Sequence, residues 1–218
     1  MRGQLSGQPI IAAQRLPTDA KPGAREQLMD AASNLMCERD TLDISLNEIA
    51  LRAGVNSALV KYYFGNKLGM MIALLDRNLA KSIEQVNGLV ALNITTRQKM
   101  RVHVRGIMRL YFQYPYMQRL LVAVMRDAPQ DVAQDVANRL IRPMADAQAT
   151  ILAAGAASGE FREVDPRLFY FMVIGACDQI FSARLVMKYI HGIDGLDEQL
   201  LRAYVDEVTK MVMGGLKS

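Results

Sequence analysis

The chain has 218 residues, 51% of them hydrophobic and 6% aromatic, and its formal net charge is +4 at pH 7. This length allows one or two domains with a hydrophobic core, and no run approaches the roughly 18 uninterrupted apolar residues that indicate a membrane-spanning helix. Residues 1–67 hold 8 Lys or Arg against 7 Asp or Glu, so charge alone is only a weak indication of nucleic-acid binding.

Two further features concern the compartment. The cysteines, Cys37 and Cys177, are isolated from each other in the sequence, which suits buried thiols in a reducing environment. The N-terminus lacks the basic region, apolar core and small-residue cleavage site of a secretory signal. We therefore expect a cytoplasmic protein with no membrane partner.

The first elements in chain order are an arm and a helix. Residues 1–21 contain Gly, Gln and two Pro among scattered basic residues, and this composition predicts a flexible arm. Such an arm is either an idle tail or a contact to a DNA minor groove or phosphate. Residues 24–39 keep a helical period. The inner face of this predicted helix consists of Leu28, Ala31, Ala32, Leu35 and Met36.

Residues 45–67 contain two short helical patterns joined by a glycine-centred turn. Ser45 and Glu48 have the spacing of a capping box, which predicts the start of the first helix. Gly54 follows where a left-handed cap is needed, and Asn56 is a suitable N-cap for the second helix. Two helices at a fixed crossing, with small and polar residues opening the second, are typical of a helix-turn-helix that enters the DNA major groove.

The exposed positions of this segment are the candidate DNA contacts. Asn56 and Ser57 are able to hydrogen-bond to base edges or phosphates, and Leu59 is able to meet a thymine methyl group. Equally, Asn56 could only cap its helix and Leu59 could only pack in the core. Lys61 is a phosphate candidate, because a cation there gains counterion-release free energy. Ser45 and Asn47 lie where the amides of a helix N-terminus face a phosphate. The candidates are Ser45, Asn47, Asn56, Ser57, Ala58, Leu59, Lys61 and Tyr62.

The stretch SLNEIALRAGVNSALVKYYFGNK resembles the N-terminal motif of the TetR family of one-component bacterial transcription regulators. The matching residues are Ile49, Ala50, Ala53, Gly54, Val55, Tyr63, Phe64 and Lys67. The resemblance implies a helix-turn-helix domain over residues 22–67, in which Lys67 contacts the DNA backbone. It also implies a helical ligand-binding and dimerisation domain over residues 68–218. Ala58, Leu59 and Lys61 depart from the family pattern at DNA-facing positions, so no operator sequence can be transferred.

The remaining pattern predicts an all-α chain without alternating strand segments. A long helix at 66–90 is expected to link the two domains. Pro143 falls within one predicted helix and marks either a kink or the true start of that helix. The predicted helices after the first are 45–53, 56–63, 66–90, 95–113, 116–127, 130–157, 166–189 and 197–213.

Ligand candidates in the second domain depend mainly on the resemblance. Methionines are abundant on the predicted helices and either fill the core or line a soft apolar pocket. His103, Tyr111 and Asp178 are polar groups on otherwise apolar helices, and each could orient a ligand or simply be a surface or core residue. With Met144 they are the candidate ligand-binding residues. The last two helices have wide apolar faces, which fits a homodimer joined by a four-helix bundle.

Motifs of enzymes are absent from the sequence. It contains no G-x-S-x-G, phosphate-binding glycine loop, H-E-x-x-H or C-x-x-C, so we expect no catalysis, cofactor or metal site. The predicted function is a sequence-specific transcriptional regulator, a dimeric repressor that a small apolar or amphipathic effector releases from a double-stranded DNA operator. Two alternatives remain open: an activator of the same fold, and a helical ligand-binding or scaffold dimer that does not bind DNA.

Overall fold

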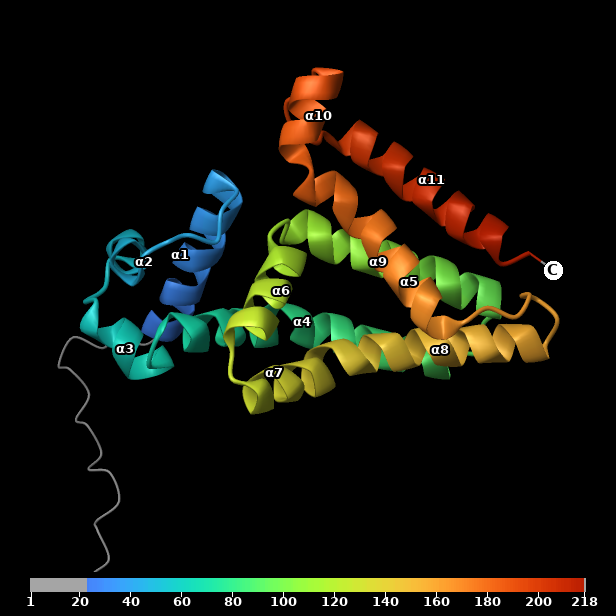
Figure 1. The fold of residues 1–218 in the computed structure, drawn as a ribbon, viewed down its shortest axis with the longest axis horizontal. Helices are drawn as coiled ribbons and strands as arrows, with labels where there is room; N and C mark the ends of the chain where they lie inside the picture. Colours follow the sequence, from blue (N-terminus) through green and yellow to red (C-terminus); the bar gives the residue numbers. More distant parts are fainter. Residues whose placement is uncertain (1–22, 218) are drawn as a thin grey trace, which may run out of the picture.

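The computed structural model describes residues 23–217, so the arm predicted over residues 1–21 lies outside the described part. Every regular element within residues 23–217 is helical, which confirms the predicted all-α class (Figure 1). The elements are α1 (Ala24–Arg39), α2 (Leu46–Ala53), α3 (Ala58–Phe64), α4 (Lys67–Ala91), α5 (Thr96–Gln113), α6 (Met117–Asp127), α7 (Gln130–Val136), the π-helix η1 (Ala137–Ile141), α8 (Arg142–Ala157), α9 (Pro166–Ser182), α10 (Arg184–His191) and α11 (Glu198–Gly215).

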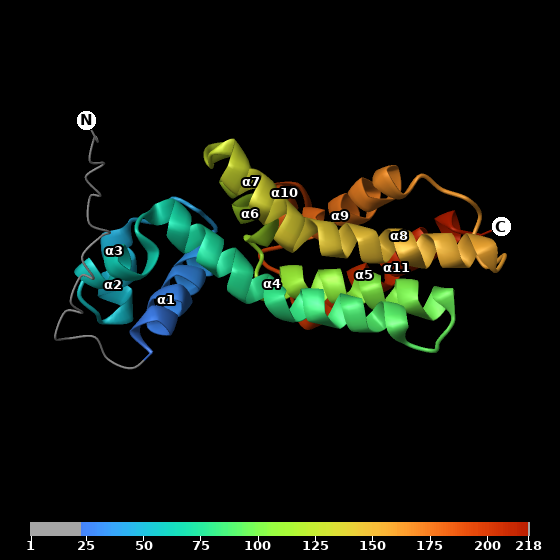
Figure 2. The ribbon, with the colours of Figure 1, turned by 90° about the horizontal axis from the view of Figure 1, so that it is seen from below.

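Helices α1, α2 and α3 form a small unit at one end of the molecule, which we call the head (Figures 1 and 2). The predicted inner face of α1 is buried against α2 and α3. Ser45 and Glu48 make both hydrogen bonds of the predicted capping box at the start of α2. Gly54 ends α2 at φ 66°, a left-handed conformation that glycine adopts without steric cost. These local signals fix the crossing of α2 and α3.

The long helix α4 connects the head to the larger helical body (Figures 1 and 2). Its first turn is capped by Asn66, whose side-chain oxygen accepts a hydrogen bond from the Gly69 N–H at 2.9 Å. Near its start α4 contacts α1 and α3, and further along it contacts α5, α6 and α8. Its buried residues include Leu74 on the head side and Val86 and Leu89 within the body. One rigid element therefore packs in both parts.

The body is arranged around α5, which contacts α4, α8, α9 and α11. The single helix predicted at 130–157 is instead interrupted by η1. Pro143, in the first turn of α8, has no N–H to donate to the Arg139 carbonyl, so the regular hydrogen-bond ladder cannot continue through this point. Of the two expectations for Pro143, the start of a helix is the one observed.

The helix predicted at 166–189 is also broken, between α9 and α10. Ala183, at φ −101° and ψ 32°, leaves the helical region, and the two helices meet at a 64° bend. Within residues 23–217 no single helix has the length and apolar composition for a membrane span; only the bent pair α9 and α10 together reaches those two criteria.

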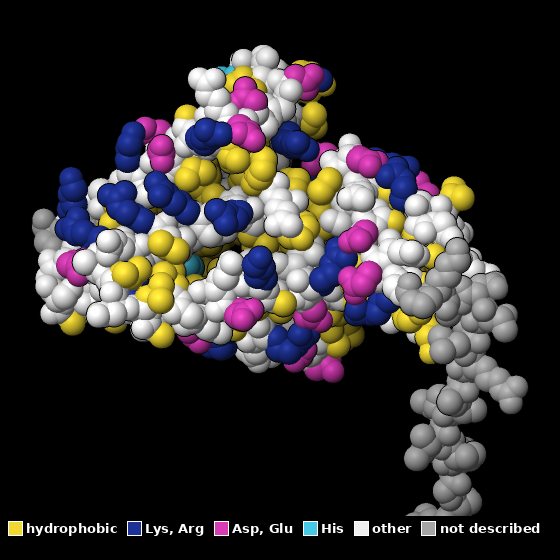
Figure 3. All heavy atoms as spheres, turned by 180° about the vertical axis from the view of Figure 1, so that it is seen from behind, with side chains coloured by type: hydrophobic (Ala, Val, Ile, Leu, Met, Phe, Trp, Pro, Cys, Tyr) yellow, Lys and Arg dark blue, Asp and Glu magenta, His cyan; other side chains and the backbone are white. Residues whose placement is uncertain are grey.

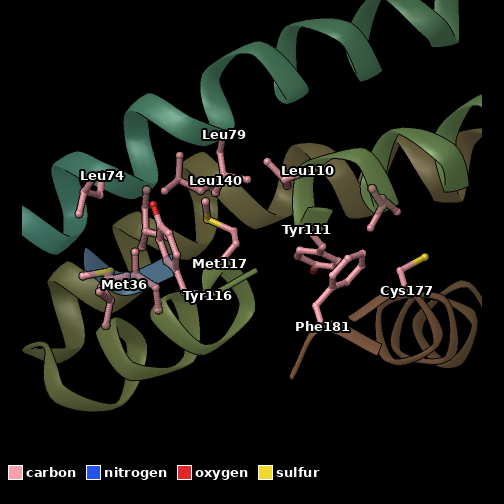
Figure 4. Packing of buried hydrophobic residues seen from close by; sticks show 14 of the residues in the cluster. Met36, Leu74, Leu79, Leu110, Tyr111, Tyr116, Met117, Leu140, Cys177 and Phe181 are labelled. Carbon is pink, nitrogen blue, oxygen red and sulfur yellow. The ribbon is translucent and has the colours of Figure 1, made fainter. Parts of the chain in front are cut away.

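A buried tyrosine joins the head to the body. Tyr116, directly before α6, is fully buried; its O–H donates to the Ser33 Oγ of α1 at 2.7 Å, and Asn78 of α4 donates its side-chain N–H to the Tyr116 oxygen at 3.1 Å. Figure 4 shows this ring in a cluster with Met36 and Leu74. Three helices from the two parts therefore share one set of polar contacts.

Candidate DNA-binding surface and ligand cavities

The outer side of α3 presents four exposed side chains, Ser57, Ala58, Lys61 and Tyr62. Ser57 and Lys61 are four residues apart, as are Ala58 and Tyr62, so all four share one side of the helix. The Tyr62 ring is held edge-on against Tyr63, with 5.1 Å between ring centroids. We call these four residues the α3 face. It is small and polar at its N-terminal end and bears a cation and an aromatic ring one turn later.

Lys61 supplies the positive charge of the α3 face. Of the four Lys and Arg residues at positions 39–67, it is the one with no ion pair to any described residue. The other three are paired: Arg39 with Glu48 at 2.7 Å, Arg52 with Glu38 at 2.8 Å, and Lys67 with Asp43 at 3.6 Å. Lys61 is therefore available for a phosphate without first losing an internal partner.

Two of the sequence-predicted contacts have internal roles in the head. The predicted thymine contact of Leu59 is wrong, because its side chain is fully buried and packs with the hydrophobic core. The N-cap of α3 is Ser57 and not Asn56 as predicted; Asn56 stands one residue earlier, and its side-chain oxygen accepts a hydrogen bond from the Ala58 N–H at 2.8 Å. The side chain of Asn56 is nevertheless exposed, so its amide donors remain accessible.

The N-terminus of α2 is occupied by its own capping box. Both the N–H and the O–H of Ser45 donate to the Glu48 carboxylate, at 2.9 and 2.8 Å, so neither is free for DNA, contrary to the prediction for Ser45. Arg39 also donates to Glu48, and together these bonds lower the pKa of Glu48 to about 2. Asn47 is exposed. The exposed Asn47 and the ion-paired Lys67 remain the candidates flanking the α3 face.

The body contains a cavity of about 500 Å³ between α4 and α5, which we call the α4–α5 cavity. His103 and Met144, two of the predicted ligand residues, line it. Its walls are otherwise largely apolar. The lining residues are Ser82, Gln85, Val86, Gly88, Leu89, Leu92, Val102, His103, Arg105, Gly106, Ile107, Arg109 and Met144.

A second, inner cavity of about 40 Å³ lies deeper in the body, between α4, α5, α6, η1 and α9. Tyr111 lines it, and Figure 4 shows the Tyr111 ring beside Phe181. Met144 and Ile107 line both cavities, so a wall of two side chains separates them. Asp178 lines neither cavity, contrary to its predicted ligand role; its carboxylate accepts a hydrogen bond from the Ser182 hydroxyl at 2.6 Å.

His103 is a neutral polar group in the wall of the α4–α5 cavity. Only 4% of the residue is exposed, and its Nε2 lies 3.2 Å from the Oε1 of the fully buried Gln148. Burial lowers the pKa of His103 to about 4, although the bond to Gln148 acts in the opposite direction. At neutral pH the cavity wall therefore offers an uncharged imidazole.

Among the cavity residues that were not identified from the sequence are two glycines and two arginines. Gly88 and Gly106 stand within the helices α4 and α5, and Arg105 and Arg109 lie one turn apart on α5. The signal was present, because glycine is unfavourable inside a helix and an interior glycine calls for an explanation. The packing of α4 against α5 that places both glycines on one cavity cannot be read from the sequence.

The head and the cavity-bearing body define a helical protein of the helix-turn-helix regulator type. Residues 28–74 match the family described as bacterial regulatory proteins, tetR family, and residues 93–218 match the tetracyclin repressor-like C-terminal domain. The chain belongs to the tetR family of bacterial regulatory proteins, in agreement with the resemblance of residues 45–67.

Individual relatives match to different extents. The transcriptional regulator BetI of Rhizobium meliloti is 32% identical over 85 residues, which cover 39% of this chain and 42% of that relative. The chain thus spans less than half of that protein. The fatty acid metabolism regulator protein of Bacillus subtilis is 22% identical over 183 residues, covering 84% and 94%. The structure of the regulator FadR from Bacillus subtilis in complex with stearoyl-CoA has a TM-score of 0.67 at 22% identity, covers 88% and 98% of the two chains, and shows the same fold.

Proposed function

We propose that this protein is a sequence-specific DNA-binding transcriptional regulator, acting as a homodimeric repressor that a small amphipathic ligand releases from DNA. The observation that carries this proposal is the α3 face: exposed small and polar residues and an unpaired Lys61, on a head that α4 joins directly to a cavity-bearing body. The proposal is for a binding protein that works where DNA is found, in the cytoplasm, and not for an enzyme.

Contacts to DNA would be divided between two kinds. Ser57, Ala58 and Tyr62 would face base edges in the major groove. Ser57 and Ala58 lie at the N-terminus of α3, and Tyr62 lies one turn after Ala58 on the same side of the helix. Lys61 and Lys67 would contact phosphates, with Asn47 beside them. Leu59 is excluded from this set by its burial.

A homodimer is supported by a large apolar surface on the C-terminal helices. These exposed side chains face away from the body core, and such a patch on a helical protein favours a partner surface of the same kind. They are Leu168, Phe171 and Met172 of α9, Leu185, Val186, Tyr189 and Ile190 of α10, and Met211 of α11. We call this set the C-terminal apolar face. Two copies joined there would carry two heads, as a two-half-site operator requires.

Ligand control is supported by the two cavities and by the relatives. The fatty acid regulator of Bacillus subtilis and the stearoyl-CoA complex favour a ligand with an alkyl chain. A ligand that binds one arrangement of the heads better than another shifts the population towards that arrangement. Because α4 packs in both the head and the body, it is the element through which a filled cavity would act.

The test is a gel shift with DNA from upstream of the protein's own gene, in excess unlabelled random DNA. We expect a shifted band that survives the competitor and is lost in Ala58→Glu, which places a negative charge on the α3 face. Ala80→Glu, at an exposed position of α4, is the matched control and should bind normally. If no specific band forms at low salt, the helical dimer that does not bind DNA is favoured; reporter output in a deletion strain separates a repressor from an activator.

A further inference from the structure

Two exposed glycines line the α4–α5 cavity. Gly88 of α4 and Gly106 of α5 both line it, and a Cβ atom built on either would meet no atom within 4 Å. Neither glycine has the positive φ that only glycine tolerates, and neither makes a close approach to a neighbour. Since glycine destabilises a helix interior relative to alanine, these two positions lower helix stability without serving the packing. A side chain at either position would enter open space at the cavity, and glycine leaves that space unfilled.

The rim of this cavity is positively charged. Arg105 and Arg109 line it, and no Asp or Glu is among its lining residues. Arg109 makes no ion pair with any residue from 23 to 217. Arg105 lies 3.4 Å from Asp206 of α11, but both side chains are more than half exposed, so this pair is weak and easily exchanged. Figure 3 shows Lys and Arg side chains beside a hollow with hydrophobic walls and a histidine inside.

The inner wall of the cavity has the opposite character. Apolar side chains from α4, α5 and α8 line it, ending at Ile107 and Met144, which also line the inner cavity. Methionine is flexible and unbranched, so Met144 is able to change rotamer and join the two spaces. A ligand that matches both ends has an anionic head and an alkyl chain.

We infer that the α4–α5 cavity binds an anionic amphiphile, with its carboxylate or phosphate group at Arg105 and Arg109 and its alkyl chain running past Gly88 and Gly106 towards Met144. This inference rests on the proposed function, because it identifies the chemical class of the effector and where each end lies. The anionic head could belong to a free fatty acid or to the phosphates of an acyl thioester. The alkyl part is the same in both cases.

Calorimetric titration of the full chain with three twelve-carbon probes tests the inference. Dodecanoate and dodecanoyl-CoA carry an anionic head, and dodecanol does not. We expect at least one anionic probe to bind about tenfold or more tightly than dodecanol, since charge-assisted hydrogen bonds to arginine are lost with the alcohol. The probe with the larger advantage identifies the source of the head group. Equal affinities for all three, or no binding, would overturn the inference.

Variants separate the two ends of the site. Arg105→Gln with Arg109→Gln should remove the advantage of the anionic probe and leave dodecanol binding unchanged. Arg101→Gln, an exposed arginine on the same helix that does not line the cavity, is the control. Gly106→Leu should abolish binding of every probe with an unchanged or higher melting temperature, because the side chain enters open space and favours the helix. Ala80→Leu, exposed on α4 outside the cavity, should bind normally.

The same samples distinguish this inference from the proposed function. Gel shifts of the ligand-free protein report DNA binding by itself. Specific DNA binding without an anionic advantage would overturn only the inference about the cavity. Failure to bind any specific DNA would contradict the proposed function, even if dodecanoate bound. Binding of an anionic probe that Gly106→Leu leaves unchanged would place the ligand elsewhere and also overturn the inference.

Discussion

Lys61 and His103 are basic side chains in opposite environments, one exposed on the head and one buried in the body. Lys61 is exposed on the head and has no acidic partner among the described residues. His103 is buried in the body and kept neutral, with its pKa lowered to about 4. The first arrangement suits attraction to an external anion, and the second suits an uncharged cavity wall. Each leads to a measurement in solution.

Substitution of Lys61 by alanine should weaken binding to every DNA sequence by a similar factor. The reason is that a phosphate contact acts through counterion release and carries no base information. In a plot of the logarithm of the binding constant against that of the salt concentration, the slope should fall by about one per protomer. Lys81→Ala, an exposed lysine on α4, should leave the slope unchanged. A relaxed base preference with an unchanged slope would show that Lys61 contacts a base.

Protonation of His103 should make the protein less stable in mild acid. The unfolded side chain titrates near 6.5 and the folded one near 4, so between these values the unfolded state binds more protons. The free energy of unfolding therefore falls as pH is lowered through this window, by up to about 1.4 kcal/mol per pH unit from this group. Urea unfolding at pH 6.5 and pH 5, at one protein concentration, should show a loss about 1.5 kcal/mol larger in the wild type than in His103→Gln. Equal losses would mean that His103 is not kept neutral by burial.

At the scale of elements, local signals predicted the head more fully than the body. The first helix was predicted at 24–39 and observed there, because the helical spacing of its buried residues is encoded within the segment itself. The break of 130–157 at η1 was foreshadowed by Pro143. The break at Ala183 was not, since alanine favours helices and does not mark the end of one.

The candidate site was predictable to the extent that local sequence determines exposure. Lys61 and Tyr62 fell on the exposed side of α3, while Leu59 did not, because the rotation of α3 is set by its packing on α1 and α4. The cavity was less accessible to prediction. His103 and Met144 are distant in the sequence. The two arginines and two glycines that line the cavity come together only when α4 packs beside α5.

Removal of the Tyr116 hydroxyl should loosen the contact between head and body. Burial raises the pKa of Tyr116 to about 12, so it remains a donor to Ser33 at neutral pH. In Tyr116→Phe, the Ser33 hydroxyl loses its donor and the buried Asn78 side chain loses its acceptor. The expected loss is about 1–3 kcal/mol in the free energy of unfolding, measured by urea denaturation. Tyr62→Phe, in which the residue is 39% exposed on the head and lies outside the C-terminal apolar face, should change stability little in the absence of DNA. An equally small change in both variants would show that the buried contacts contribute nothing.

At the scale of the whole molecule, the C-terminal apolar face lies on helices of the body that are separate from the head (Figure 1). Dimerisation through that face would leave both heads free and would set the distance between them. Half-sites on one side of DNA are about 34–36 Å apart, or a multiple of this. A small change in the direction of α4 within the body would be enlarged at the head, since α4 spans 25 residues.

Phe171→Glu should therefore separate the dimer without unfolding the protomer. Phe171 is 72% exposed in the single chain, so a charge there costs little in the monomer but would be buried without a partner in the dimer. Sedimentation velocity should give the mass of one chain for Phe171→Glu and of two for the wild type. The variant's helical circular dichroism should remain unchanged.

Val122→Glu provides the matched control, because Val122 is also exposed, at 52%, but lies on α6 away from the C-terminal apolar face. It should stay dimeric. If Phe171→Glu also remained dimeric, the dimer surface would lie elsewhere. If both variants and the wild type were monomeric, two heads could meet only on DNA, and the occupancy of a two-site operator would rise steeply with protein concentration. With a preformed dimer, the second half-site is bound at a high effective concentration, and loss of that advantage in Phe171→Glu should weaken operator binding far more than binding to a single half-site.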